Sequence, residues 1–429
     1  MPRILLLIPT SSYRTQAFLD AARRLGVEIT VGSERPNVLT PTNPSGLLTV
    51  SITDNTKAAT TVTEFATTFP IDAVIGVDDQ TTVTAAVVSA ALGLKHNSIE
   101  SVSAARNKYM MRELFSRAGV PQPRYFLCSI DELPDSVAHS IAYPCVVKPI
   151  MLAGSRGVIR VNSEAEFAAA FRRIEKILRA SDIACENETQ SLLVENYVSG
   201  IEVAVEGLLV KSKLQVLAIF DKPDPLEGPF FEETIYVTPS RLPQNDQQKI
   251  TVCVQQAVDA LGLLEGPIHA ELRINEQGIW MLELAARSIG GYCSRSLRFT
   301  NGPELLSLEE LILRRALGME TNSLQRESNA SGVMMIPIPQ PGILKKISGV
   351  EEAKAVPGMV DIILTTHIGQ QLVPLPEGSS YIGFIFCREQ TPQIVEERLR
   401  VAHNKLRFEV ESTGNDLPDR VLESCHETT

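Results

Sequence analysis

Two glutamates, Glu271 and Glu283, have the spacing that most clearly predicts chemistry in this sequence. Each lies in a run that alternates apolar and polar residues, as hairpin strands do: Ile268–Ile274 and Ile279–Ala285. A three-residue loop, Glu276–Gly278, would place the two carboxylates directly opposite each other, with Cβ atoms about 5 Å apart. Hard oxygen ligands at this separation suit Mg²⁺, which binds one or two carboxylates together with substrate phosphates.

The same register gives the predicted hairpin two different faces. The apolar face consists of Ile268, Ala270, Leu272, Ile274, Trp280, Leu282 and Leu284. The other face carries His269, Glu271, Arg273, Met281 and Glu283, with Arg287 just beyond the second strand. An alternative interpretation is an ordinary exposed face on which Arg273 or Arg287 neutralises the two acids. Because side chains alternate along a strand, a slip of one residue would move the two glutamates onto opposite faces.

The elements before this hairpin begin with a parallel α/β pattern. Short apolar runs at Ile4–Ile8, Glu28–Gly32 and Ala73–Val77 are typical of buried strands, and Thr81–Leu92 is a predicted helix that Gly93 ends. Strands that alternate with helices indicate a parallel sheet. The glycine fingerprint of nicotinamide-binding folds does not follow the first strand, and Gly-Lys, which a Walker A loop requires, does not occur.

The middle and the end of the chain are predicted to contain further strands and helices. Helices are expected at Ser103–Ala118, after Ser163, where Glu166 suggests a capping box, and after Thr391. Strands are expected at Cys145–Lys148, Leu192–Val194, Ile201–Leu209, Leu214–Phe220, Val333–Ile336, Asp361–Leu364 and Ile382–Phe386. The polar stretch Glu320–Ser331 is the best linker candidate.

Composition excludes several classes of protein. At about 150 residues per domain, 429 residues suggest two to four domains. The formal net charge of −11 disfavours a nucleic-acid binder, which normally has a basic excess. Without a long apolar run or a signal-peptide layout, we expect neither membrane insertion nor secretion. Seven cysteines without a Cys-x-x-Cys pair indicate reduced thiols in a cytoplasmic protein rather than disulfides or zinc.

Seven motifs, taken in order, resemble those of the ATP-grasp carboxylate–amine ligases, and the resemblance extends over about residues 4–407. They are Asn-Lys-x-x-Met-Arg at 107–112, Val-Val-Lys-Pro at 146–149, Ala-Gly-Ser-Arg-Gly at 153–157, Leu-Val-Glu-Asn-Tyr-Val at 193–198, Gly-Ile-Glu at 200–202, His-Ala-Glu at 269–271 and Glu-Leu-Ala-Ala-Arg at 283–287. Each motif alone is weakly specific, whereas their combination in this order is strongly specific.

The resemblance implies a multidomain protein of the α/β and α+β classes. A Rossmann-like pre-ATP-grasp domain is expected at residues 1–105, and an ATP-grasp domain with its flap at residues 106–325. An α+β domain is expected at residues 326–429. A homodimer is the usual expectation for such an enzyme.

The resemblance also implies the residues that bind ATP. Lys108 and Lys148 resemble the two lysines that hold the phosphates, and Glu202 resembles the acid that accepts hydrogen bonds from the ribose hydroxyls. The loop that contains Gly154, Ser155 and Gly157 resembles the flap whose backbone N–H groups close over the phosphates. The segment with Glu195, Asn196 and Val198 resembles the hinge that hydrogen-bonds adenine.

The residues implied for catalysis follow in the second half of the chain. Glu271 and Glu283 resemble the magnesium ligands (Mn²⁺ is possible), and Arg287 resembles the arginine that binds the transferred phosphate. His269 is a candidate to assist the amine or the carboxylate, and a packed core histidine is its alternative. Lys222 is a candidate contact of the γ-phosphate.

One departure from the family pattern narrows the resemblance. Many ATP-grasp enzymes have Asn two residues after the second metal-binding Glu, and here that position is Ala285. The combination of His-x-Glu and Glu-x-Ala-Ala-Arg is similar to the bacterial L-amino-acid ligases, which join two amino acids.

The implied reaction is amide or peptide bond formation through an acyl phosphate, with release of ADP and phosphate. Amino acids are the expected substrates. The alternatives are a ligase that uses a non-amino-acid carboxylate or amine, a nucleotide-binding regulatory protein that has lost the reaction, and, last, an NAD oxidoreductase.

Overall fold

The computed structural model describes residues 1–10, 12–180, 190–319 and 324–412. By the density of contacts the chain forms two compact units, and each combines separate segments. Unit 1 comprises Met1–Gln122, Glu202–Asp221 and Val237–Ser331, and unit 2 comprises Pro123–Ile201, Lys222–Tyr236 and Gly332–Thr429. The predicted division at residues 105 and 325 stays a prediction.

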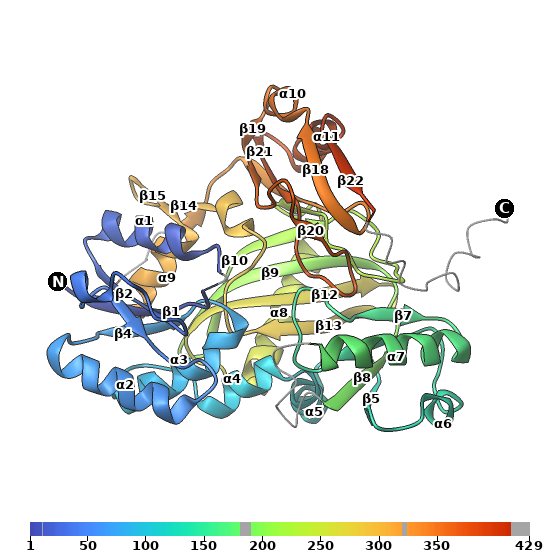
Figure 1. Cartoon of the computed structure of the whole chain (residues 1–429), viewed down its shortest axis with the longest axis horizontal. Helices are drawn as coiled ribbons and strands as arrows, with labels where there is room; N and C mark the ends of the chain where they lie inside the picture. Colours follow the sequence, from blue (N-terminus) through green and yellow to red (C-terminus); the bar gives the residue numbers. More distant parts are fainter. Residues whose placement is uncertain (11, 181–189, 320–323, 413–429) are drawn as a thin grey trace. The chain divides into compact units, whose positions relative to one another are not determined.

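Unit 1 begins with a parallel sheet in the order β3-β2-β1-β4. Its strands are β1 (Arg3–Leu7), β2 (Glu28–Ser33), β3 (Leu47–Thr49) and β4 (Ala73–Gly76). Helices α2 (Asn55–Thr68) and α3 (Asp79–Ala91) pack together on one side, and α1 (Thr15–Leu25) lies on the other, against α9 (Leu308–Ala316) (Figure 1). The predicted α/β start of the chain is therefore confirmed. Because β1 and β4 are parallel neighbours, the loops that follow them meet at the same edge of the sheet.

The second sheet of unit 1 carries the glutamate hairpin. Its strands in unit 1 follow the order β13-β12-β9-β10: β9 (Ile201–Val210), β10 (Lys213–Lys222), β12 (Gly266–Asn275) and β13 (Gly278–Ala285). A hydrophobic core joins them to helices α4 (Ile99–Arg106), α5 (Lys108–Ala118) and α8 (Gln244–Leu261). A small sheet, β15-β14-β16, completes the unit: β14 (Arg298–Asn301), β15 (Glu304–Ser307) and β16 (Leu324–Arg326).

Two predicted features of these segments are wrong. Ser103–Ala118 is not one helix, because α4 ends at Arg106 and Asn107 caps a new helix, its side chain accepting hydrogen bonds from the N–H groups of Tyr109 and Met110. Glu320–Ser331 is not simply a linker either, since β16 and the start of β17 (Ala330–Ile336) occupy its described part and residues 320–323 lie outside the description.

Unit 2 contains a four-stranded sheet in the order β5-β8-β6-β7. The strands are β5 (Tyr125–Ser129), β6 (Cys145–Pro149), β7 (Ile159–Val161) and β8 (Ser191–Asn196), and they share a core with helices α6 (Pro134–Ala138) and α7 (Glu164–Arg179). Ser163 caps α7 as expected, but Glu166 returns to the Asn162 N–H rather than to the Ser163 N–H.

The remainder of unit 2 is the predicted α+β region. Its strands form the orders β17-β21-β19 and β20-β18-β22. The elements are β18 (Gly342–Ser348), α10 (Val350–Lys354), β19 (Met359–Leu364), β20 (Gln371–Leu372), β21 (Gly383–Glu389), α11 (Pro392–His403) and β22 (Arg407–Glu411). Strand β11 (Ile235–Thr238) spans the boundary between the units along the chain.

Candidate active site

The hairpin β12–β13 places Glu271 directly opposite Glu283, but by a different route from the one predicted. Asn275 pairs with Gly278, so the loop contains two residues and the predicted three-residue loop is wrong. A β-bulge then restores the register: Leu272 pairs with Met281, whereas Glu271 pairs with Glu283. The extra residue on β13 compensates for the shorter loop, and Glu271 and Glu283 are paired across the hairpin as expected.

The bulge also changes which residues of β13 enter the core. Met281 is fully buried, whereas Trp280 and Leu282 are only half-buried, so the predicted faces of these three residues are wrong. The alternation shifts by one because the bulged residue, Leu282, has no partner on β12. Its carbonyl instead accepts a hydrogen bond of 2.6 Å from Nη2 of Arg112, a buried residue of α5.

Charged side chains of unit 1 surround the two glutamates. Lys108, at the first position of α5, lies with Nζ 3.0 Å from Oε1 of Glu283. The break at Asn107 therefore positions this lysine beside the predicted metal ligands. The alternative in which Arg273 or Arg287 neutralises the acids stays an alternative: Arg273 Nε donates to Glu202 Oε2 at 2.9 Å, with both side chains buried, but the charge of Glu283 also acts on Arg287.

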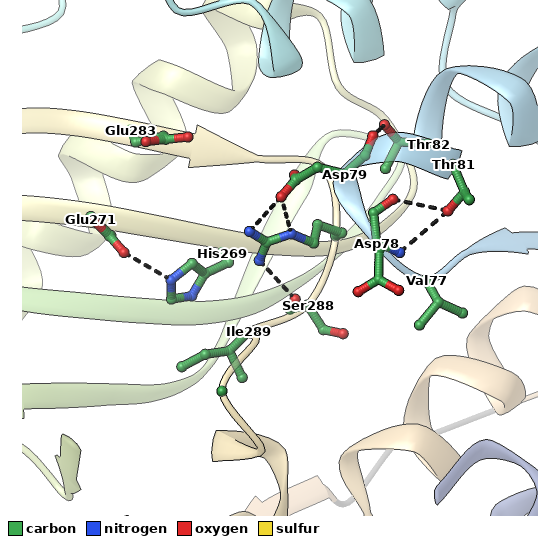
Figure 2. A network of polar contacts seen from close by, with 12 residues as sticks. Val77, Asp78, Asp79, Thr81, Thr82, His269, Glu271, Glu283, Ser288 and Ile289 are labelled. Atoms are coloured by element: carbon green, nitrogen blue, oxygen red, sulfur yellow. Dashed lines mark hydrogen bonds and ion pairs between the residues drawn. The ribbon is translucent and has the colours of Figure 1, made fainter. Parts of the chain in front are cut away.

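Arg287 forms an ion pair with Asp79, a residue that the sequence analysis did not identify. Two guanidinium nitrogens lie 2.7 and 2.8 Å from the Oδ2 atom of Asp79 (Figure 2). Burial alone would raise the pKa of Asp79, but the charge and hydrogen bond of Arg287 outweigh burial and lower this pKa. Asp79 could have been identified from its position in the sequence. It follows β4, a parallel strand, at the carboxyl edge of the sheet, where α/β proteins bind ligands.

His269 lies between two glutamates. Its Nε2 atom is 3.4 Å from Oε1 of Glu271, and its Nδ1 atom is 3.4 Å from Oε2 of Glu206. Glu206 is fully buried on β9 and accepts a hydrogen bond of 3.0 Å from the N–H of Ile289. Burial raises the pKa of Glu206. Glu202 and Glu206 both lie on β9 but have different partners: Glu202 accepts a hydrogen bond from Arg273, and Glu206 lies beside His269.

Further contacts that the sequence did not predict connect the loops after β1 and β4 to the segment that follows Arg287. Arg14, from the loop after β1, donates to the carbonyl of Val77 at 2.9 Å and to Ser288. The ring of Tyr13 stacks on Tyr292 with centroids 4.2 Å apart. These partners are distant in sequence, so contacts between distant parts of the chain position the segment around Arg287.

Unit 2 holds the other predicted lysine and the hinge. Lys148 on β6 and Glu195 on β8 form a buried ion pair, with Nζ 2.7 Å from Oε2. Asn196 ends β8, exposed at the surface, and donates its backbone N–H to Arg124 at 2.9 Å, and Val198 follows, half-buried. Two of the predicted ATP-binding residues, Lys148 and Glu195, are therefore in contact with each other.

The predicted flap loop is anchored within unit 2. Gly154, Ser155 and Gly157 all have positive φ angles, which small residues tolerate. The Gly157 N–H donates to the carbonyl of Pro376 at 2.9 Å, so this donor is already engaged. Lys222, the candidate γ-phosphate contact, has Nζ 2.5 Å from Oε1 of Glu233.

The residues present fit a magnesium ion. Glu271 and Glu283 supply carboxylate oxygens from directly opposed positions, and 24% and 34% of their side chains remain exposed. Ala285 contributes no ligand atom from its side chain. The ammonium of Lys108 lies beside Glu283 at this position.

Three family models match this chain. The ATP-grasp N-terminal domain matches residues 19–96, the ATP-grasp domain residues 141–296 and the L-amino acid ligase C-terminal domain 2 residues 334–411. Within the described ranges, none of the helices is long and apolar enough to cross a membrane.

Individual relatives agree with these models. The y4rH protein of Sinorhizobium fredii is 24% identical over 90% of this chain and 78% of its own. The alanine–anticapsin ligase of Bacillus subtilis is 26% identical over 51% of this chain and 48% of its own. The crystal structure of an L-amino acid ligase from Bacillus licheniformis superimposes with a TM-score of 0.82 and 25% identity, covering 96% of this chain and 99% of that one.

The chain therefore belongs to the ATP-grasp family, whose members use ATP. Within that family it carries the C-terminal domain of the L-amino acid ligases and is an ADP-forming C–N ligase. The resemblance inferred from the seven motifs and the multidomain fold class are both confirmed.

Proposed function

We propose that this enzyme joins two amino acids through an amide bond in a reaction that needs ATP and Mg²⁺. One observation carries the proposal: Glu271 and Glu283 are paired across the hairpin, with Lys108 at Glu283, in the same unit as the arginine of the Arg287–Asp79 pair. Together these groups supply metal ligands and cations, the two requirements of phosphoryl transfer. The amino-acid substrates are supported by the similarity to the alanine–anticapsin and L-amino acid ligases.

The following residues are proposed to bind the nucleotide. Lys108 and Lys148 hold phosphates as point charges, and Lys222 contacts the γ-phosphate. Glu195, Asn196 and Val198 bind adenine, much of it through backbone groups, and Glu202 accepts from the ribose hydroxyls. Each of these lysines forms an ion pair with a glutamate, so phosphate oxygens of ATP would have to replace these carboxylates.

The reaction has two steps. A carboxylate oxygen of the first substrate attacks the γ-phosphorus, the bond to the bridging oxygen of ADP breaks, and an acyl phosphate forms. The amine nitrogen of the second substrate then attacks the acyl carbon, the carbon–oxygen bond to phosphate breaks, and the amine loses a proton. Arg287 binds the transferred phosphate, and His269 orients a reacting group.

The remaining parts of the site exclude water and hold the metal. The loop around Gly154, Ser155 and Gly157 covers the phosphates, protecting the acyl phosphate from hydrolysis. Glu271 and Glu283 hold Mg²⁺, which neutralises phosphate charge when bound.

A pairwise screen of amino acids tests this function. Phosphate release is measured with ATP and Mg²⁺, and the products are then identified by mass. We expect phosphate release only when two suitable amino acids are present, and a product equal in mass to both substrates minus water. Glu283→Gln is the inactive control. The amino-acid assignment would be contradicted if MgATP raises the melting temperature, which shows nucleotide binding, but none of the amino-acid pairs causes phosphate release.

A further inference from the structure

A cavity of about 120 Å³ lies within unit 1, and neither Glu271 nor Glu283 lines it. Strand β4, helices α3 and α9 and the start of β12 line it, and it opens to solvent on one side. Its lining mixes apolar and polar side chains, and Val74, Ala85, Ala86, Val102, Ile312 and Ala316 form an apolar part of it. Since an apolar cavity of about 150 Å³ accepts benzene, this one has room for a tail of roughly four or five carbon atoms.

Two cationic side chains line the same cavity. Arg315 lies on α9, and its Nε atom is buried without a hydrogen-bond partner in the described part of the chain. Lys95 also lines the cavity and has an exposed side chain. The only carboxylate in the lining belongs to Glu265, whose Oε1 accepts the N–H of Lys211 at 3.3 Å. The cavity therefore combines an apolar part with an excess of positive charge.

The neighbouring arginine on α9 makes the contrast clear. Arg314 does not line the cavity; its Nε atom is also buried without a hydrogen-bond partner among the described residues, but its Nη2 atom forms an ion pair of 2.8 Å with Glu304. Arg315 makes no such pair among the described residues. A buried guanidinium donor without an acceptor is costly, and its planar fork matches a carboxylate in two parallel hydrogen bonds.

We propose that this cavity is a binding site for a small monocarboxylate with a short branched apolar tail. The carboxylate contacts Arg315 and Lys95, and the tail fills the space beside Ala86 and Ile312. Gly76, Thr82 and Ala286 also line the cavity, so the ligand contacts both chain segments that carry the Asp79–Arg287 ion pair. The proposal does not depend on the proposed ligase reaction.

Calorimetric titration of the full chain with isovalerate tests the proposal. We expect one isovalerate per chain, and at least tenfold weaker binding of acetate, which lacks the tail, and of isobutylamine, which has a similar tail but the opposite charge. Arg315→Gln and Lys95→Gln should each weaken binding, Arg315→Gln by tenfold or more. Ala316→Leu should block binding by filling the cavity, whereas Arg314→Gln, the matched control, should leave it unchanged.

The reaction centre must be distinguished from this cavity, because isovalerate is also a carboxylate. Binding that survives in Arg287→Gln and is lost in Arg315→Gln supports the cavity. Binding that is lost in Arg287→Gln and survives in Arg315→Gln overturns the proposal, as does equal affinity for isovalerate and isobutylamine. Because Lys95 is exposed, Lys95→Gln gives an answer even if Arg315→Gln fails to fold.

Discussion

Two lysine–glutamate pairs, one in each unit, differ in how far they open to solvent. In unit 2, the side chains of Lys148 and Glu195 are 9% and 4% exposed, so both ends of the pair are buried. In unit 1, the side chain of Lys108 is 8% exposed but that of Glu283 is 34% exposed. The unit 2 pair is therefore enclosed by protein, whereas the unit 1 pair offers a carboxylate to solvent.

This difference indicates separate tasks for two pairs of the same chemistry. Breaking a buried pair leaves an uncompensated charge and is strongly destabilising, whereas an exposed carboxylate can be rehydrated. We infer that Lys148–Glu195 contributes to the stability of its sheet as well as to nucleotide binding. Glu283 can exchange its partner at lower cost, as a metal ligand requires.

The largest expected effect concerns Glu283, the partly exposed member of the Lys108–Glu283 pair. Glu283→Gln should reduce turnover by on the order of a thousandfold, because several kcal/mol of charge neutralisation at the phosphates is lost. The measurement is ADP release at saturating ATP and Mg²⁺. Glu304→Gln, which removes a partly exposed glutamate paired with Arg314, is the matched control and should retain activity. An active Glu283→Gln enzyme would remove this residue from the metal site.

The next prediction tests the comparison itself through stability. Lys148→Met should lower the free energy of unfolding by about 3 kcal/mol, because Glu195 stays buried without the charge of this lysine. Lys108→Met should cost only about 1 kcal/mol, since Glu283 is partly hydrated. Urea denaturation of the ligand-free proteins measures both values. Equal losses, or a larger loss for Lys108→Met, would contradict the proposed difference between the pairs.

A third prediction concerns how the stability that the Asp79–Arg287 ion pair contributes depends on pH. Asp79→Asn should cost about 2 kcal/mol at neutral pH, because Arg287 loses its ion-pair partner. Arg287 holds the pKa of Asp79 below its ordinary value of 3.8, so this stabilisation is present above that value and is lost as the pH falls through the lower pKa of the folded state. The stability difference between the wild type and Asp79→Asn should therefore shrink towards acid pH. A constant difference from pH 7 to pH 3 would rule out this ion pair as its source.

The sequence predicted the order of elements well where local signals were strong. The strands around Ile4 and Ala73 and the helix after Thr391 are present, because apolar runs and capping residues act over a few positions. Asn107 was missed as a helix break, although an N-cap between two helical patterns was the available signal. Partners such as Asp79 for Arg287 require two segments about 200 residues apart, and no local pattern specifies them.

The hairpin illustrates a correct conclusion that rests on a wrong detail. The prediction of Glu271 opposite Glu283 assumed a three-residue loop with an uninterrupted register. The structure has a two-residue loop and a bulge at Leu282, and these two differences cancel at the glutamates. They do not cancel between the loop and the bulge, where Met281 rather than Trp280 enters the core. A bulge has no clear sequence signal in this strand, so its position could not be predicted.

The smallest expected effect distinguishes these two registers. Trp280 is half-buried, and its Nε1 donates a hydrogen bond of 3.2 Å to the side chain of Asn275. Trp280→Phe should therefore cost about 0.5–1 kcal/mol, the contribution of one hydrogen bond with little change in packing. Met281 is fully buried, so Met281→Ala, the comparison variant, should cost about 2–5 kcal/mol. In the uninterrupted register Trp280 would fill the core and Met281 would face the acids, which reverses the order of the two losses. Urea denaturation of both variants decides between the registers, and a larger loss for Trp280→Phe than for Met281→Ala would exclude the bulge at Leu282.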